Sequence, residues 1–414
     1  MLIVHAADIH LDSPLAGLTL RAGERASDLV GATRRAFTAL VDHTIEIEAS
    51  LLLIAGDLYD GDWRDFSTGL FFVSEMARLD RAGIRVGVIK GNHDAENQMT
   101  RSLTWPGNVK VFRSDRAETW TLDGLSVAVH GRSFPKRDVT ENIALAYPDP
   151  VPGLLNIGML HTAADGRPGH AFYAPCSIRE LVAKGYDYWA LGHIHARAVL
   201  SENPWVVFPG NLQGRHANEA GPKGATVLTV DGHEITGVEH VTLDVVRWEH
   251  VRVDLSGSDE YEDALARVRD VLSNAVDAAE GRTLAARLTI SGRTPLHSEL
   301  AGDLERTRAE CLGIAQQVGG DVWVERVVLQ TEDFERPVAS TDADAIAELL
   351  RTVDEILKSS EEMNALKASL EQSLTRVPAR VRELAGLKEV DDGTLVTVLE
   401  GATATLRHRL LGAG

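Results

Sequence analysis

Residues 86–94 read Val-Gly-Val-Ile-Lys-Gly-Asn-His-Asp, an apolar run followed at once by a turn and three polar side chains. The apolar part is typical of a buried strand, and Gly91 lets the chain turn sharply where that strand ends. The side chains of Asn92, His93 and Asp94 then supply an amide, an imidazole and a carboxylate in consecutive positions. Ordinary turns are also rich in Asn and Asp. Core packing does not require these three groups together, whereas a metal-assisted reaction does.

Four other stretches have the same form, a predicted strand followed by polar side chains. The strands and the groups that follow them are Leu2–Ala7 with Asp8-Ile9-His10, Leu51–Ala55 with Gly56-Asp57-Leu58-Tyr59-Asp60, Leu155–Leu160 with His161, and Tyr188–Leu191 with Gly192-His193-Ile194-His195. Further strands are predicted over 126–130, 206–208 and 225–230, and amphipathic helices over 33–48 and 65–82. Alternating strands and helices predict an α/β fold with its ligands at the carboxyl ends of the strands.

Length and composition set the outer bounds. A chain of 414 residues predicts two or three domains. Hydrophobic content of 44% and charged content of 25% are those of a soluble globular protein. The absence of a bilayer-spanning run and of a signal peptide, with only two cysteines, predicts a cytoplasmic protein and no membrane partner. The net charge of -19 argues against a general polyanion-binding surface, so nucleic acid would have to be held by local basic patches and by metal cations.

The polar groups at the strand ends have the chemistry of a metal site. Carboxylate, imidazole and amide ligands together suit Mn, Fe or Zn better than Ca or Mg alone. They are too many for one tetrahedral ion and suit two ions that share a carboxylate, as in phosphoryl-transfer enzymes. A lone Asp-x-His is more often a loop and a lone buried His a core residue, but five such groups at strand ends favour the site. The candidate ligands are Asp8, His10, Asp57, Asn92, His161, His193 and His195.

These five motifs resemble the signatures of calcineurin-like metallophosphoesterases, over about residues 1–240. Within that superfamily, His5–Pro14 and Pro209–His216 are similar to SbcD-type repair nucleases, the bacterial relatives of the meiotic-recombination-eleven nuclease, and in particular to the YhaO-like branch. The resemblance implies an α/β sandwich of two sheets flanked by helices in residues 1–245. It also implies a small α/β capping domain in 246–335 and a helical, partner-binding region in 336–414.

The resemblance also implies a role for each polar group. Asp8, His10 and His195 would hold one metal ion, and Asn92, His161 and His193 the other, with Asp57 between them. His93 would stabilise the scissile phosphate or protonate the leaving oxygen. Asp94 would orient His93, or would simply belong to the turn. Manganese is the family's usual metal, with magnesium, iron and zinc as alternatives.

One position departs from the pattern of the repair nucleases. They commonly carry a histidine, associated with the handling of DNA ends, where this chain has Asp60. A carboxylate there would repel phosphate unless a metal ion or a base lies beside it. The departure weighs against exonuclease action more than against phosphodiester chemistry.

Basic residues near the predicted strand ends are candidates for binding DNA. The segment 132–137 follows a strand end and combines an aromatic ring with three cations, which suits phosphate contacts. A second group follows the Pro209-Gly210 turn. An ordinary solvated loop is the alternative for each. The candidate residues are Arg132, Lys136, Arg137, Arg215 and Lys223.

The remainder of the chain carries no metal-type cluster. Strands are predicted over 249–255, 285–291 and 322–329, and helices over 261–278 and 298–318. Residues 342–387 are acidic and helical, with an apolar stripe, and a last helix is predicted over 395–411. By resemblance the stripe would bind an SbcC-like coiled-coil ATPase; the alternative is docking on the phosphoesterase domain. Helices 65–82 and 95–104 are candidates for a homodimer contact.

Three functions remain open. The first is a DNA nuclease of a repair complex, either an exonuclease or an endonuclease. The second is a phosphoesterase that acts on nucleotides, cyclic nucleotides or phosphoproteins with the same metal pair, which the net charge and Asp60 favour. The third is an interaction protein with a vestigial metal site, against which the complete ligand set argues.

Overall fold

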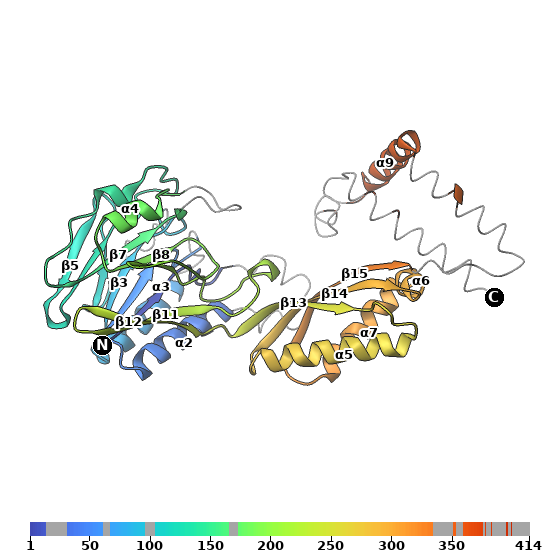
Figure 1. The fold of residues 1–414 in the computed structure, drawn as a ribbon, viewed down its shortest axis with the longest axis horizontal. Helices are drawn as coiled ribbons and strands as arrows, with labels where there is room; N and C mark the ends of the chain where they lie inside the picture. The colour runs from blue at the N-terminus through green and yellow to red at the C-terminus, as the bar shows by residue number, and fades with distance from the viewer. Residues whose placement is uncertain are drawn as a thin grey trace, which may run out of the picture. The chain divides into compact units, whose positions relative to one another are not determined.

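The computed structural model describes residues 1–13, 31–60, 67–95, 104–164 and 173–333, with 351–352, 359–375, 377, 382, 395 and 399. The chain divides into two compact units, Met1–Trp248 and Glu249–Gly414 (Figure 1). The predicted helices over 95–104 and 395–411 fall almost entirely outside the described residues.

The first sheet of the first unit has six strands in the order β12-β11-β1-β2-β3-β4. The strands β1 to β4 run parallel to one another, while β11 is antiparallel to both β1 and β12. Their bounds are β1 Leu2–Ala6, β2 Leu51–Ala55, β3 Arg85–Ile89, β4 Val109–Val111, β11 Gly224–Asp231 and β12 Glu234–Thr242.

The second sheet also has six strands, in the order β5-β6-β7-β8-β10-β9. The four central strands are parallel, and the two edge strands β5 and β9 are antiparallel to their neighbours. Their bounds are β5 Glu118–Leu122, β6 Val127–Gly131, β7 Leu155–His161, β8 Tyr188–Gly192, β9 Ala198–Glu202 and β10 Trp205–Phe208.

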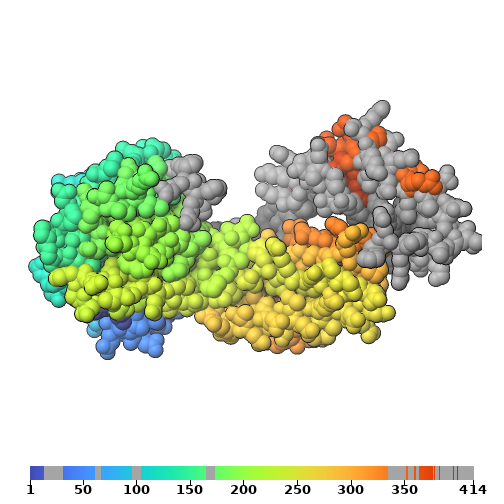
Figure 2. All heavy atoms as spheres, in the orientation of Figure 1, coloured from blue at the N-terminus to red at the C-terminus, as the bar shows by residue number. Residues whose placement is uncertain are grey.

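The two sheets pack face to face around one apolar layer. Leu53 of the first sheet and Ile157 of the second belong to this layer, and neither is exposed to solvent. Helices α2 (Ala32–Glu46) and α3 (Ser67–Arg81) pack on the outer face of the first sheet. The short helix α4 (Ile178–Ala183) packs on the outer face of the second. In Figure 2, atoms of the second sheet (teal to green) lie above those of the β11–β12 edge of the first (yellow-green). The predicted class, two sheets flanked by helices, is confirmed.

The second unit contains a sheet of three strands in the order β13-β14-β15, with β14 and β15 parallel. Its elements are β13 Val246–Asp254, α5 Tyr261–Ala278, β14 Thr283–Thr294, α6 His297–Gly302, α7 Leu304–Gln317 and β15 Val322–Asp333. The single helix predicted over 298–318 is wrong, because Asp303 ends α6 and its side chain accepts a hydrogen bond from Arg306 N to cap α7. Further along, α9 spans Ser360–Leu374.

The strands that lead to the polar motifs were predicted to within a residue or two. The missed strands β4, β5, β9 and β12 are the edge strands of the two sheets, and they lack the continuous buried apolar runs of the central strands. Among the described residues, no helix is long and apolar enough to cross a membrane.

Candidate metal centre

The predicted ligands lie at the carboxyl ends of both sheets. Asp8, Asp57 and Asn92 follow the parallel strands β1, β2 and β3 of the first sheet. His161 ends β7 of the second sheet, and His193 and His195 follow β8. Because the sheets pack face to face, these two sets of side chains meet at one end of the sandwich.

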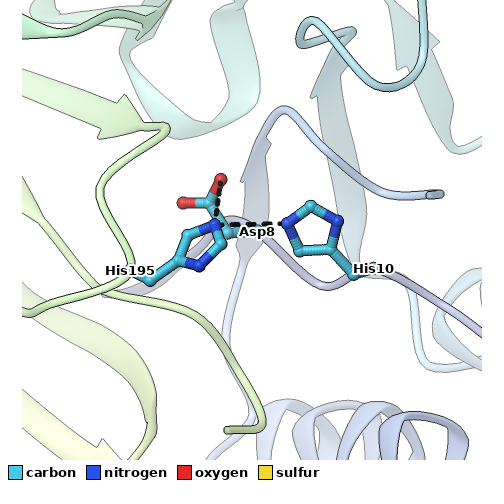
Figure 3. A group of neighbouring side chains, drawn as sticks. All are labelled: Asp8, His10 and His195. Atoms are coloured by element: carbon cyan, nitrogen blue, oxygen red, sulfur yellow. Dashed lines mark hydrogen bonds and ion pairs between the residues drawn. The ribbon is translucent and has the colours of Figure 1, made fainter. Parts of the chain in front are cut away.

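The first group consists of Asp8, His10 and His195 (Figure 3). The Nε2 atoms of His10 and His195 face each other at 3.3 Å, and His195 Nε2 lies 3.9 Å from Asp8 Oδ1. The Asp8 carboxylate is held by the backbone N–H of His193, which donates to both of its oxygens at 3.1 and 3.0 Å. Two imidazole nitrogens and a carboxylate therefore converge on one point.

The second group consists of Asp57, His161 and His193. His161 Nε2 lies 3.4 Å from Asp57 Oδ2 and 3.0 Å from Asn92 Oδ1. His161 Nδ1 lies 3.0 Å from Ala55 O, which can only accept, so Nδ1 donates this hydrogen bond and Nε2 is the nitrogen that faces Asp57 and Asn92. The amide, carboxylate and imidazoles expected at the second metal ion are thus together.

Asp57 lies between the two groups. Its Oδ2 is 4.0 Å from His10 Nε2 in the first group, besides its contact with His161 in the second. Burial raises the pKa of Asp57, but the charge and hydrogen bond of His161 outweigh burial and hold it below its usual value. Burial lowers the pKa of His161, and the Asp57 carboxylate raises it to about 9. The carboxylate therefore stays ionised, as a shared ligand must.

The residues present fit a pair of divalent cations. Asp8 and Asp57 are each only 1% exposed, a costly position for carboxylates without a compensating charge. In each group the ligand atoms lie within 4.8 Å of one another, and the carboxylate–imidazole separations of 3.4–4.0 Å exceed those of good hydrogen bonds. The mixture of hard oxygens and imidazole nitrogens suits the metals expected from the sequence.

Glycines make room for the ligands to approach. A Cβ on Gly91 would lie 2.2 Å from Asp57 Oδ1, and a Cβ on Gly56 would lie 2.4 Å from His161 Nδ1. At Gly192 a Cβ would lie 2.0 Å from Ala55 O, where a strand end of the second sheet meets one of the first. All three distances are shorter than real Cβ contacts, so the motif glycines are required by the site itself.

The backbone at four candidate ligands adopts positive φ. The values are 50° at Asp8, 47° at His10, 50° at Asp57 and 103° at His193. Non-glycine residues adopt such angles rarely, and each costs of the order of 1–3 kcal/mol. The strained backbone therefore occurs at the residues whose side chains form the two groups of candidate ligands.

His93 is supported by Asp60 rather than by Asp94. His93 Nδ1 lies 2.7 Å from Asp60 Oδ1, and this hydrogen bond raises the pKa of His93 above its ordinary value. Asp94 instead accepts hydrogen bonds from Leu58 N, Tyr59 N and Gly91 N. The structure thus favours the turn interpretation of Asp94, and its predicted role as the group that orients His93 falls to Asp60.

A second carboxylate, Glu219, was not singled out from the sequence. It lies at the end of a short 3-10 turn, Ala217–Glu219, and its Oε1 is 2.7 Å from His195 Nδ1. Burial raises the pKa of Glu219, but its hydrogen bond with His195 and the charge of Arg215 outweigh burial and lower it. Nothing in the local sequence pattern pairs Glu219 with His195, which lies on a different turn of the chain.

The basic candidates fall into two classes. Lys136 and Arg137 are exposed on the loop after β6, whereas Arg132 is half-buried and donates from Nε to Ser114 O at 3.2 Å. The guanidinium group of Arg215 reaches into the site. Its Nη2 lies 3.2 Å from Glu219 Oε1, and its Nη1 lies 3.8 Å from Asp60 Oδ2. Lys223 is 7% exposed and donates from Nζ to His195 O at 2.9 Å. This corrects the expectation that Lys223 contacts DNA, because its ammonium group is directed inward.

Comparison with known proteins agrees with this geometry. A family model described as calcineurin-like phosphoesterase matches residues 1–197, and one described as the middle domain of metallophosphoesterase YhaO matches residues 248–332. The chain is 35% identical over 296 residues to "Uncharacterized metallophosphoesterase YhaO" of Bacillus subtilis, a match that covers 70% of this chain and 72% of that protein.

More distant relatives carry a description of their biological role. The chain is 28% identical over 213 residues to "DNA double-strand break repair protein Mre11" of Methanopyrus kandleri, covering 47% of this chain and 44% of that protein. It is 23% identical over 259 residues to the protein of the same description from Sulfurisphaera tokodaii, covering 59% and 63%. The chain therefore spans less than two thirds of the length of these two relatives.

Proposed function

Because the chain belongs to the calcineurin-like metallophosphoesterases, a family of metal-dependent hydrolases, we propose that it is a phosphodiesterase that cleaves DNA. The observation that carries the proposal is the position of Asp57 between two groups of ligands. When bound, two divalent ions would activate a water molecule and stabilise the charge that develops on the phosphoryl oxygens. Manganese is the ion we propose, with magnesium, iron and zinc as alternatives.

The chain's own residues supply the rest of the chemistry. Asp8, His10 and His195 would hold one ion, Asn92, His161 and His193 would hold the other, and Asp57 would be shared between them. His93 is 32% exposed and stands beside the ligands, with its ring 5.0 Å from that of His10. The hydrogen bond to Asp60 raises the pKa of His93 and so favours the protonated ring, which suits His93 to protonate the leaving oxygen.

The loop after β6 supports DNA as the substrate. Phe134 is 1% exposed, and its ring packs edge-on against that of His161 at 5.5 Å. This contact fixes the loop beside the metal centre, while Lys136 and Arg137 remain exposed two and three residues further on. Exposed cations so placed would bind the phosphates that flank the scissile bond. The description of the Mre11 relatives as DNA repair proteins supports the same substrate.

The negative charge of Asp60 does not prevent phosphate binding, because basic side chains lie beside it. A phosphate can approach this carboxylate only if a metal ion or a base lies beside it. His93 Nδ1 lies 2.7 Å from it and an Arg215 nitrogen 3.8 Å. Its charge is therefore largely balanced before a phosphate arrives.

Helix α9 in the C-terminal region carries a row of apolar side chains that could bind a partner. Met363, Leu366, Leu370 and Leu374 recur along α9 at helical spacing, and all four are partly exposed. We propose that this region binds an SbcC-like coiled-coil ATPase in the cytoplasm, and that the phosphoesterase unit forms a homodimer through α3. Cleavage of nucleotides, cyclic nucleotides or phosphoproteins is the second candidate, favoured by the net charge of -19.

The test compares substrates on one protein preparation. The purified chain is incubated with Mn²⁺ and linear duplex, single-stranded and hairpin DNA, and separately with a small aryl phosphodiester. His93→Ala serves as the inactive variant. His233→Ala is the matched control, since His233 is exposed in the β11–β12 turn at the opposite end of the sheet.

Cleavage of DNA by the wild-type chain and the His233 variant, but not by the His93 variant, is the expected result. The product lengths then distinguish exonuclease from endonuclease action. Hydrolysis of the aryl ester with all DNA substrates intact, even after addition of the ATPase, would contradict DNA as the substrate and favour small phosphoesters.

A further inference from the structure

The imidazole of His195 is held from behind by a carboxylate. Its Nδ1 lies 2.7 Å from Glu219 Oε1, and Glu219 is 7% exposed. A carboxylate can only accept a hydrogen bond, so Nδ1 donates to Glu219, which is closer to it than the Arg215 amino group at 3.3 Å. The Nε2 atom is then the ring nitrogen left to bind a metal ion, and it is the atom that faces His10 and Asp8.

Both oxygens of Glu219 are themselves fixed. Oε2 accepts hydrogen bonds from Asn211 Nδ2 at 2.9 Å and from Arg215 N at 2.7 Å, while Arg215 also donates from its side chain to Oε1 at 3.2 Å. The carboxylate therefore has little freedom to rotate. A fixed acceptor fixes both the tautomer and the ring orientation of the histidine that donates to it.

The other histidine ligands are held in different ways. His161 donates from Nδ1 to the backbone carbonyl of Ala55, a contact that no side-chain substitution removes. His10 Nδ1 is buried and has no hydrogen-bond partner among the described residues. Of His10, His161 and His195, the last is therefore the one whose Nδ1 hydrogen bond is made by a side chain that can be replaced.

We propose that Glu219 is a positioning residue of the metal centre, which holds His195 so that Nε2 completes the site formed with Asp8 and His10. This inference rests on the proposed metal pair but not on the identity of the phosphoester. Glu219 belongs to neither group of candidate ligands, and its proposed action on the site is through His195. Interactions of this kind contribute about 10–100-fold to metal affinity.

The test measures metal binding rather than catalysis. Mn²⁺ is titrated into chelator-stripped protein by calorimetry, with wild type, Glu219→Ala, His195→Ala and the double variant. Asn218→Ala is the matched control, because Asn218 is an exposed neighbour in the same short turn. The visible absorption of bound Co²⁺, which reports ligand geometry, is recorded for each protein.

The wild-type chain should bind two ions, and Glu219→Ala should weaken one of them about 10–100-fold and alter the Co²⁺ spectrum. Asn218→Ala should match the wild type. Because Glu219 acts through His195, the double variant should bind like His195→Ala alone. Wild-type affinity in Glu219→Ala, or additive losses in the double variant, would overturn the proposal.

Folding is checked by circular dichroism in chelator. If Glu219→Ala does not fold, Glu219→Gln takes its place in the same cycle, with a smaller expected loss because the amide oxygen still accepts from Nδ1. DNA cleavage is not part of the readout. A chain that binds two ions and cuts no DNA would contradict the proposed function while the titration still decides the role of Glu219.

Discussion

Asp60 Oδ1 lies 2.7 Å from His93 Nδ1, so the acidic residue that separates this chain from the repair nucleases supports the residue proposed to protonate the leaving group. The second oxygen of Asp60 accepts a hydrogen bond from Ser13 Oγ at 2.7 Å, which fixes the carboxylate. The same pair explains the raised pKa of His93. The carboxylate that the sequence indicated as an obstacle to phosphate is thus hydrogen-bonded to the residue proposed as the general acid.

Asp60→Asn should lower kcat for the aryl phosphodiester and change KM little. General acid catalysis contributes about 10²–10⁴-fold, so the loss should not exceed that range. Because the hydrogen bond to Asp60 raises the pKa of His93, its removal lowers that pKa. The alkaline limb of the pH–kcat profile should therefore move to lower pH. Asp231→Asn is the control, because Asp231 is an exposed carboxylate at the far end of β11. If the alkaline limb of the pH–kcat profile does not move in Asp60→Asn, the proposed role of the Asp60–His93 pair is wrong.

Gly91→Ala should abolish high-affinity Mn²⁺ binding. The added Cβ would lie 2.2 Å from Asp57 Oδ1, so the shared carboxylate must move away from both groups of ligands. Overpacking of this kind costs about 1–3 kcal/mol of folding stability. Calorimetric titration and thermal unfolding measure the two effects. Gly107→Ala, where an added Cβ meets nothing within 4 Å, should leave both quantities unchanged.

Replacing Lys136 and Arg137 by alanine should weaken DNA binding and reduce its salt dependence. Each phosphate contact contributes about 0.9 to the slope of log affinity against log salt concentration, so losing two should reduce the slope by about 1 to 2. Binding is measured by fluorescence anisotropy in the His93→Ala background, which prevents cleavage. Arg85→Ala is the control, since Arg85 is exposed at the opposite end of β3. An unchanged slope would remove this loop from the DNA-binding surface.

The buried His5 should make the metal-free chain less stable in acid. Burial lowers its pKa from 6.5 to about 3, and its ring nitrogens contact Tyr188 Oη and Leu191 O. Between pH 6.5 and about 3, His5 binds a proton in the unfolded chain but not in the folded chain. His5 therefore contributes full stability above pH 6.5, and this contribution falls as the pH drops toward 3, by about 1.4 kcal/mol per pH unit.

Urea unfolding in chelator between pH 7.5 and 4 measures this effect. The difference in unfolding free energy between wild type and His5→Gln should shrink as the pH falls, because glutamine does not titrate. His233→Ala, which removes an exposed imidazole, should follow the wild-type curve. A difference that stays constant over the whole pH range would show that His5 is not the titrating group.

The sequence predicted the parts of the fold and site that local pattern encodes. The buried central strands are continuous apolar runs, and the groups that follow them, such as Asp8 and His161, lie where parallel strands must deliver them. The partners of those groups could not be predicted in the same way. Asp60 contacts His93, and Glu219 contacts His195, between residues that lie on different turns of the chain. The sequence of Lys223 is typical of a surface cation, but the residue is buried. Its ammonium group donates a hydrogen bond to the backbone carbonyl of His195, which the sequence does not indicate.

The origin of the ligands in two sheets has a consequence for the order of events in folding. Asp57 comes from the first sheet and His161 from the second, and Gly192 lies against Ala55 where the sheets meet. Neither sheet alone contains a complete group of ligands, because Asp8 and Asp57 follow strands of the first sheet whereas His193 and His195 follow β8 of the second. Each group of ligands is therefore complete only once the two sheets have packed together, so the metal centre forms together with the closed sandwich.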